Sequence, residues 1–152
     1  MAQFEVTVSL RSTVEAAFDF LSLPANSVKI SPPDANLQIV EAPARFELGS
    51  RFEFLLGGFG PPQKILHEIS LFEPPRRITE TLVRGPLESW VHHHIVEDEG
   101  GGRIAVIDRI EFEPPGGLVG MLVTEEMILQ SLQTGFEHRH REIRKLLEQD
   151  SE

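Results

Sequence analysis

The sequence predicts an α+β fold in which a seven-stranded, curved antiparallel sheet wraps around one long C-terminal helix. Three observations support this prediction. Apolar and polar residues alternate in most segments before residue 113, short turns rich in glycine and proline separate these segments, and apolar residues recur every three or four positions after residue 117. A chain of 152 residues suits one hydrophobic core, so we expect residues 1–150 to form a single domain.

The chain begins with a strand followed by two short helices. Apolar residues alternate from Phe4 to Leu10, which is typical of a strand with one buried face. Ser12 or Thr13 then provides an N-cap for a helix, and Pro24 ends that helix. Residues 25–30 could add one more helical turn before a Pro-Pro pair stops it.

Six further strands are predicted, and their connectors are short enough for consecutive strands to pair as an antiparallel meander. They cover Leu37–Val40, Arg45–Leu56, Gln63–Phe72, Arg77–Arg84, Trp90–Val96 and Arg103–Phe112. The glycine-rich connector after Leu56 lacks the Gly-Lys-Ser/Thr ending of a phosphate-binding loop. We interpret it as a hairpin tip, where Phe59 could gate a cavity.

The helical spacing from Leu118 to Leu147 predicts one long amphipathic helix. Its apolar stripe needs a surface to cover it, and the concave face of the sheet supplies one. The space between them is either a packed core or a pocket, and the sequence leaves both readings open.

Composition excludes several classes of function. The net charge of −10 argues against nucleic acid as a partner, and the chain has no cysteine for disulfides, thiolate ligands or a thiol nucleophile. The start lacks the features of a signal peptide, and no apolar run approaches the length of a membrane span. We therefore expect a cytoplasmic protein without membrane insertion. The basic segment 138–145 is interpreted as a helix end that favours cations rather than as an anion site.

The order of elements resembles the helix-grip fold of the START, SRPBCC and birch-pollen-allergen superfamily over nearly the whole chain. The segments Phe72–Arg77, Arg84–Pro86, Trp90–His94 and Asp108–Phe112 together resemble a bacterial subgroup labelled polyketide cyclase/dehydrase-like. The resemblance implies binding of an apolar or lipid-like small molecule in an internal cavity. It is a weaker guide to activity, because only some members of the superfamily are enzymes.

Three consecutive histidines follow the only tryptophan of the chain. Successive side chains of a strand point to opposite faces, so Trp90, His92 and His94 share one face. By the same parity Asp108 shares a face with the apolar residues of its strand, and we place all four side chains inward. His93 then faces outward and is expected to be solvated.

The pairing of strands can be estimated from the turns. A symmetric turn centred near Gly100, and another through residues 84–89, set the partners of the histidines. The expected pairs are His92 with Asp108, His94 with Val106, Glu80 with His94, Leu82 with His92, and Arg84 with Trp90. These pairs predict a polar strip across an otherwise apolar wall.

The strip and the resemblance to helix-grip proteins together leave three classes of function open. The polar residues could anchor a small hydrophobic or amphipathic ligand, which we favour, or His92 oriented by Asp108 could serve as the general base of a cyclase or dehydratase-type lyase. A third class is a protein-interaction or chaperone-cofactor module. Carboxylates beside buried histidines would also be needed merely to satisfy the imidazole nitrogens. The candidate ligand-binding residues are Trp90, His92, His94, Glu80, Leu82, Arg84, Asp108, Ile110, Phe112, Phe54, Leu132 and Phe136, and Met121 and Leu129 are further candidates for the apolar lining.

Metal binding is a separate hypothesis for the inward-facing histidines. His92 and His94 share a face and could both bind an ion, with Asp108 or, less favourably, His140 as a third ligand. The chain has no His-Glu-x-x-His motif and no cysteine pair, so we expect neither a metal nor another cofactor. Val91 and Ile95 on the outer face make a homodimer possible.

Overall fold

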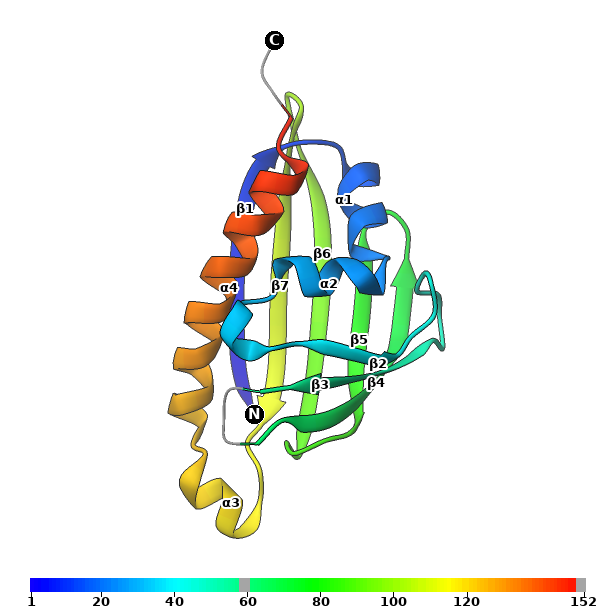
Figure 1. Ribbon diagram of the computed structural model, residues 1–152. Coiled ribbons are helices and arrows are strands. Elements are labelled where there is room, and N and C mark those ends of the chain that lie inside the picture. The colour runs from blue at the N-terminus through cyan, green and yellow to red at the C-terminus, as the bar shows by residue number, and fades with distance from the viewer. Residues whose placement is uncertain (58–60, 150–152) are drawn as a thin grey trace.

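The computed structural model describes residues 1–57 and 61–149, so Phe59 and the proposed gate lie outside the described residues. Its elements follow the order strand, two short helices, six strands and two further helices (Figure 1). They are β1 (Ala2–Arg11), α1 (Val14–Leu21), α2 (Pro24–Ile30), the 3-10 turn η1 (Pro33–Ala35), β2 (Gln38–Glu41), β3 (Arg51–Leu56), β4 (Gln63–Glu73), β5 (Arg77–Arg84), β6 (Ser89–Gly100), β7 (Arg103–Glu113), α3 (Gly117–Leu122) and α4 (Glu125–Leu147).

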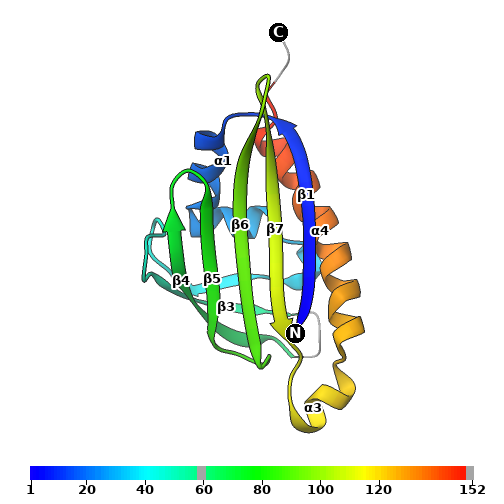
Figure 2. The same ribbon diagram turned by 180° about the vertical axis from the view of Figure 1, so that it is seen from behind.

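The strands form one antiparallel sheet in the order β1-β7-β6-β5-β4-β3-β2. This order confirms the predicted meander of six strands, and it places the first strand beside β7. The sheet bends so strongly that β2 and β3 pass across the front of β6 and β7, with α2 lying inside the curve (Figure 1). Helix α4 runs beside the edge strand β1, as the view from behind also shows (Figure 2). Thr13 caps α1 by accepting a hydrogen bond from the Ala16 N–H, as expected.

Several element boundaries differ from the sequence prediction, and the largest differences are at the start of β3 and in the C-terminal helix. Strand β3 begins at Arg51 rather than at Arg45, because residues 45–50 form a loop that includes a left-handed Gly49 with φ of 86°. The backbone N–H of Phe46 donates to the Ser22 oxygen at 2.8 Å, which ties this loop to the end of α1. The alternation that suggested a longer strand therefore belongs to a loop packed on a helix.

The predicted long C-terminal helix is confirmed as α4, but it does not extend back to Leu118, since the chain breaks between α3 and α4. Val123 is extended, and Thr124 begins a new helix by accepting a hydrogen bond from the Met127 N–H. The apolar residues of α3 do not face the sheet: Met121 is 75% exposed, which removes it from the expected lining. Spacings of three and four residues continue across the break, so periodicity alone could not reveal it.

The buried apolar residues form three clusters with a polar layer between them. Along the inward row of β7, Val106 belongs to a first cluster with α1 and α2, Asp108 follows, and Ile110 belongs to a second cluster near the start of β1. Helix α4 repeats this order, with Ile143 in the first cluster and Ile128 in the second. A third cluster joins α1 to β4 and β5. The sequence therefore places charge in the middle of the fold.

The predicted strand register is wrong by two residues on both sides of β6. His94 lies opposite Asp108 and His92 opposite Ile110, while Glu80 lies opposite His92. The β6–β7 turn is centred on Gly101 and Gly102 rather than on Gly100, and a bulge separates Asp98 from Gly100. Positive φ values at both central glycines, 64° and 81°, are those of a tight type I′ hairpin.

The far end of β5 also departs from the prediction. The β5–β6 ladder stops at Thr81 and Val91, so Leu82 pairs with His67 and Arg84 with Leu66, both on β4. Residues 85–88 form a bend that leads the chain away from β5 before β6 begins. The expected pairs of Leu82 with His92 and Arg84 with Trp90 therefore do not form.

None of the helices in the described ranges 1–57 and 61–149 has the length and apolar character needed to span a membrane.

Candidate functional site

A buried carboxylate on β7 joins the sheet to α4. Asp108 is fully buried, and its Oδ1 is 2.7 Å from His92 Nε2 while its Oδ2 is 2.6 Å from His140 Nε2. Arg139 donates to the same carboxylate, with its Nε 3.3 Å from Oδ2. The hydrogen bond between His92 and Asp108 that the sequence suggested is confirmed, although it forms diagonally rather than between directly opposed residues.

A second carboxylate, Glu80 on β5, gathers three imidazole rings. Its Oε1 is 3.2 Å from His92 Nδ1, 3.4 Å from His94 Nε2 and 3.8 Å from His67 Nδ1. The rings of His92 and His94 stack with centroids 3.8 Å apart, as expected for residues i and i+2 of one strand face. The polar strip thus extends from β4 across β5, β6 and β7 to α4.

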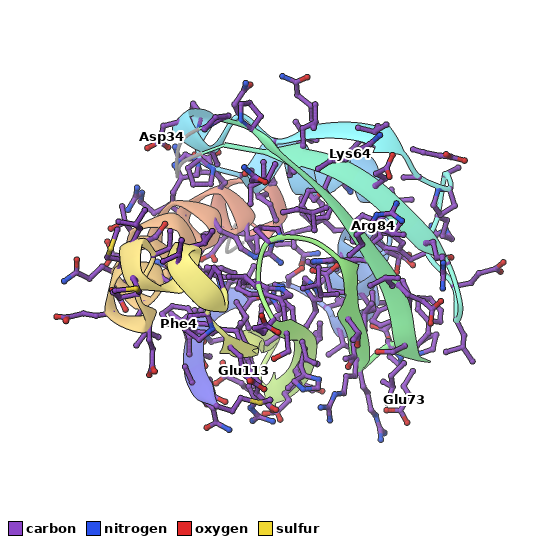
Figure 3. The ribbon with its side chains drawn as sticks, turned by 90° about the horizontal axis from the view of Figure 1, so that it is seen from below. Phe4, Asp34, Lys64, Glu73, Arg84 and Glu113 are labelled. Carbon is purple, nitrogen blue, oxygen red and sulfur yellow. The ribbon has the colours of Figure 1, made fainter. Side chains whose placement is uncertain are left out.

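Local structure holds each of these side chains in place. Strand alternation turns Glu80, His92, His94 and Asp108 toward the concave face, and the helical spacing of α4 brings Phe136 and His140 to the same side. Phe136 packs edge-on against both His92 and His140, with centroid distances of 5.6 and 6.2 Å. Figure 3, which views the fold from below, shows side chains between α4 and the curved sheet.

Both carboxylates keep their charge despite burial. Burial by itself would raise the pKa of Asp108, but the Arg139 charge and the hydrogen bonds from His140 and His92 outweigh it and hold the pKa well below the usual range. Burial acts on Glu80 in the same direction, and its three imidazole neighbours lower the pKa of Glu80 in turn. The interior of the fold therefore holds two anions, which their cationic and polar neighbours stabilise.

The stacked histidines differ in protonation. Burial lowers the pKa of His92, but hydrogen bonds to Asp108 and Glu80 outweigh burial and raise that pKa above 6.5. Burial and the neighbouring His92 charge lower the pKa of His94 to about 4. Below the raised pKa of His92, its positive charge and that of Arg139 balance the charges of Asp108 and Glu80.

His92 lacks the geometry of a general base. A base needs an unprotonated nitrogen that faces the substrate, whereas both nitrogens of His92 contact carboxylates and the side chain is 6% exposed. The imidazole is therefore held as a cation between two anions, which argues against the proton-abstracting role considered for it.

The positions of Arg84 and His93 differ from their predicted environments. Arg84 is exposed at the end of β5, and its Nη2 lies 3.5 Å from the carboxylate of Glu53, so it does not join the site (Figure 3). His93 faces outward as expected but is not solvated: its side chain is 14% exposed, and its Nδ1 is 2.9 Å from Thr79 Oγ1. Arg77 donates to the same nitrogen, so a polar cluster on the outer face of the sheet covers His93.

The sequence prediction did not include His67 or Arg139 in the site, and it named His140 only as a less favoured metal ligand. The strand of His67 gives no clear inward face, and Arg139 lies in the basic segment interpreted as a helix end that favours cations. Arg139 and His140 instead lie in the interior of α4, with side chains 13% and 8% exposed. The signal available in the sequence was their position four and three residues before Ile143, on the face that carries the apolar stripe.

The expected apolar wall divides into two groups. Ile110, Phe112 and Phe54 are buried core residues, with exposures of 8% or less. A second group faces inward yet keeps partial exposure to solvent, although its members pack against buried clusters or inward-facing rings. It comprises Phe52, Leu82, Trp90, Leu129, Leu132 and Phe136. The Nε1–H of Trp90 is buried without a hydrogen-bond partner among the described residues.

Two hollows open on the surface of the described residues. One, of about 470 Å³, lies between β1 and α4 and has Val8, Arg141, Arg144 and the inner histidine His140 in its lining. The other, of about 550 Å³, lies beside α1 and the turn between β4 and β5. The first hollow reaches the polar network through His140, which bonds to Asp108 on its inner side.

The fold is a START-like helix-grip fold. Solved structures share this fold over nearly their whole length: protein CV1439 from Chromobacterium violaceum superposes with a TM-score of 0.73 at 16% identity, covering 99% of this chain and 100% of that one. A START superfamily protein from Mycobacterium smegmatis gives 0.72 at 12% identity, covering 95% and 96%. The major latex-like protein 151 from Panax ginseng gives 0.69 at 15% identity, covering 96% and 97%.

The family of this chain follows from its sequence. The chain belongs to the family described as Domain of unknown function (DUF8410), whose model matches residues 23–147. No curated protein matches the sequence. The expected START-like fold is thus confirmed, and the polyketide cyclase/dehydrase-like subgroup stays a prediction.

Proposed function

We propose that the protein binds a small amphipathic molecule between the concave face of the sheet and α4. The observation that carries this proposal is the group of inward-facing apolar side chains that stay partly exposed beside the polar layer. Apolar side chains that face a core normally lose nearly all their exposure. Their residual exposure supports a space that an apolar molecule could fill, and burial there would contribute roughly 25 cal/mol per Å².

The polar end of the ligand would meet Trp90. A buried indole N–H without an acceptor costs about 1–3 kcal/mol, and a ligand oxygen would remove that cost. Trp90 lies two residues before His92 on the same face of β6, so its ring is close to the charged layer. The ligand would therefore carry a hydrogen-bond acceptor next to an apolar body.

The helix-grip fold is compatible with the proposed location. The START superfamily protein from M. smegmatis shares this fold at 12% identity. The fold supplies a concave sheet and a covering helix, and the residues above supply the apolar and polar groups. The ligand itself is defined here only by that chemistry.

Binding can be tested with an environment-sensitive amphipathic probe, anilinonaphthalene sulfonate, and with native mass spectra of gently purified protein. We expect saturable probe fluorescence that Leu132→Trp abolishes, because the larger side chain fills the space beside α4. Leu146→Trp is the matched control, since Leu146 is 50% exposed on the same helix. Trp90→Phe should weaken binding by about threefold to tenfold through the lost N–H donor.

The exposed residues of α3 provide the second control, because they are the surface that a protein-interaction module would use. Leu118 and Met121 are 81% and 75% exposed, and a Leu118→Ser, Met121→Ser variant should leave probe binding unchanged. If the α3 variant lost probe binding while Leu132→Trp retained it, the probe would be bound at α3. That result would refute an internal site. Native spectra without any retained mass and no probe binding would refute the proposal altogether.

A further inference from the structure

One carboxylate oxygen in the fold is surrounded by imidazole nitrogens from two neighbouring strands. The contacts of Glu80 Oε1 with His92, His94 and His67 span 3.2 to 3.8 Å. The ligating atoms of Glu80, His92 and His94 all lie within 4.8 Å of one another, so that one ion could contact them together. We propose that this cluster is a binding site for a single divalent metal ion of the zinc type, with Glu80, His92 and His94 as ligands and His67 as a fourth donor.

His67 supplies an independent reason to infer a missing partner. The residue is 5% exposed, and its buried Nδ1 has no hydrogen-bond partner among the described residues. The 3.8 Å separation from Glu80 Oε1 is too long for a hydrogen bond, and a buried polar nitrogen without one is costly. The ring stands nearly perpendicular to Phe52 and Phe54, with interplanar angles of 81° and 89°, so these aromatic rings brace the unpaired imidazole beside Glu80.

The surroundings of His92 match those of a metal-binding histidine. Such residues usually donate their second ring N–H to a carboxylate, which fixes the ring and its tautomer. His92 Nε2 lies 2.7 Å from Asp108, and its Nδ1 faces Glu80. An ion bound to Nδ1 would replace the proton that this nitrogen carries in the metal-free cation, and that proton would be released to solvent. Asp108 is in turn held by His140 and Arg139, so the outer support of the site reaches the helix.

His94 fits the site after a change of tautomer. In the ion-free geometry Arg139 Nη2 donates to His94 Nδ1 at 3.1 Å, which leaves the ring proton on Nε2. Metal binding through Nε2 requires that proton on Nδ1, so the Arg139 contact with Nδ1 would have to break. Asp108 Oδ1 lies 3.6 Å from Nδ1, and the ring would have to shift toward it before the two could form a hydrogen bond. Arg139 also donates to Asp108, so it has a partner when it leaves His94.

The donor set selects the class of ion. Imidazole nitrogens with one carboxylate oxygen suit zinc and neighbouring first-row ions, whereas magnesium and calcium favour oxygen ligands alone. The site is independent of the amphipathic ligand proposed above, because its ligands are all protein side chains. A metal ion there would add a positive charge to the floor of the proposed ligand space.

The test uses the untagged, chelator-treated full chain, refolded with and without Zn²⁺ so that burial does not prevent loading. We expect one equivalent of bound zinc and a higher melting temperature with the ion. Co²⁺ should bind in its place and show visible absorption typical of nitrogen and oxygen ligands. Glu80→Gln keeps the shape of the side chain and should weaken affinity by at least about 100-fold, and His67→Gln by about tenfold.

His93→Gln is the matched control, because His93 lies between the two histidine ligands but faces outward. This variant should bind zinc as tightly as the unmodified chain. The far-ultraviolet circular dichroism of each variant establishes that it folds, and the Co²⁺ spectrum reports ligands without reference to stability. Absence of stoichiometric binding to the folded chain, or equal affinity in Glu80→Gln and the unmodified chain, would overturn the site.

Discussion

Asp108 on β7 and His140 on α4 share a 2.6 Å hydrogen bond, although 32 positions separate them in the chain. This bond links the middle of the sheet to the middle of the helix, and it belongs to a layer in which the charges of two carboxylates, Arg139 and His92 balance. Each of these groups is satisfied only while the others are present.

Removing the charge of Asp108 should therefore destabilise the fold strongly. We expect Asp108→Asn to lower the free energy of unfolding by about 3–5 kcal/mol, because Arg139 and His92 would stay buried without their shared anion. Urea unfolding followed by circular dichroism measures the loss. Asp19→Asn is the control: Asp19 forms an exposed pair with Arg45 at 3.4 Å, and its loss should cost less than about 1 kcal/mol. Equal losses in the two variants would contradict the buried network.

The metal-free protein should lose stability in acid over a window set by His94. The pKa of His94 is about 4 in the folded chain and about 6.5 when unfolded, so between these values the unfolded chain binds the proton first. Stability should fall by about 3 kcal/mol as the pH drops from 6.5 through 4. His94→Gln should remove this fall, and His138→Gln on the outer side of the network should retain it. Unfolding in urea across this range, with chelator present, provides the measurement.

His92 should affect stability at alkaline pH, in contrast to His94, which affects it in acid. Its folded pKa is raised above 6.5, so its contribution is fully present below pH 6.5 and is lost as the pH rises through the folded value. His92→Gln should give a flatter alkaline limb than the unmodified chain. The same urea titrations extended to alkaline pH would show this, and an unchanged alkaline limb would contradict the protonated state.

Thr124 should be important for the start of α4. Its side-chain oxygen accepts from the Met127 N–H, and loss of such a cap costs about 0.5–2 kcal/mol. We expect that loss from Thr124→Ala in thermal or urea unfolding. Thr134→Ala, within the same helix and exposed, should be neutral or slightly stabilising because alanine favours helices. If Thr124→Ala left the free energy of unfolding unchanged, packing alone would fix the break after α3.

Two glycines should respond oppositely to alanine. Gly102 has φ of 81°, so Gly102→Ala should cost about 1–2 kcal/mol through backbone strain although the added carbon meets no neighbour. Gly135 lies in α4, where an added Cβ would be 3.7 Å from Pro32, an ordinary contact. Gly135→Ala should therefore stabilise by about 0.5–1 kcal/mol. Paired thermal melts of the two variants compare these signs directly.

Much of the fold could be predicted because local patterns decide it. Alternation identified the strands, and strand parity turned Trp90, His92, His94 and Asp108 inward without any knowledge of the turn. Parity also survives a register error of two residues, which is why His92 and Asp108 still meet. Register itself depended on which of three consecutive glycines forms the turn, and Gly100 was the wrong choice.

The rest of the site depends on tertiary packing that no local pattern reports. His67 and Glu80 approach because of bulges in the β4–β5 ladder, and Arg139 and His140 enter the layer because of the rotation of α4 on the sheet. The rotation of a helix is weakly determined by an apolar stripe that includes exposed residues such as Leu146. The basic composition of residues 138–145 suggested a helix end that favours cations, whereas the fold buries Arg139 and His140 within this segment.

The order of apolar, charged and apolar layers along both β7 and α4 has a consequence for how the chain selects its native alignment. Leucine and isoleucine side chains pack acceptably at several offsets. A helix that slid by one turn, about 5.4 Å, in the direction that brings Phe136 to the place of His140 would put an apolar side chain against Asp108. Burying the Asp108 carboxylate without a cationic partner would cost several kcal/mol of folding free energy, so this one residue destabilises such a misaligned compact state. The charged layer thereby favours a single alignment of the helix on the sheet.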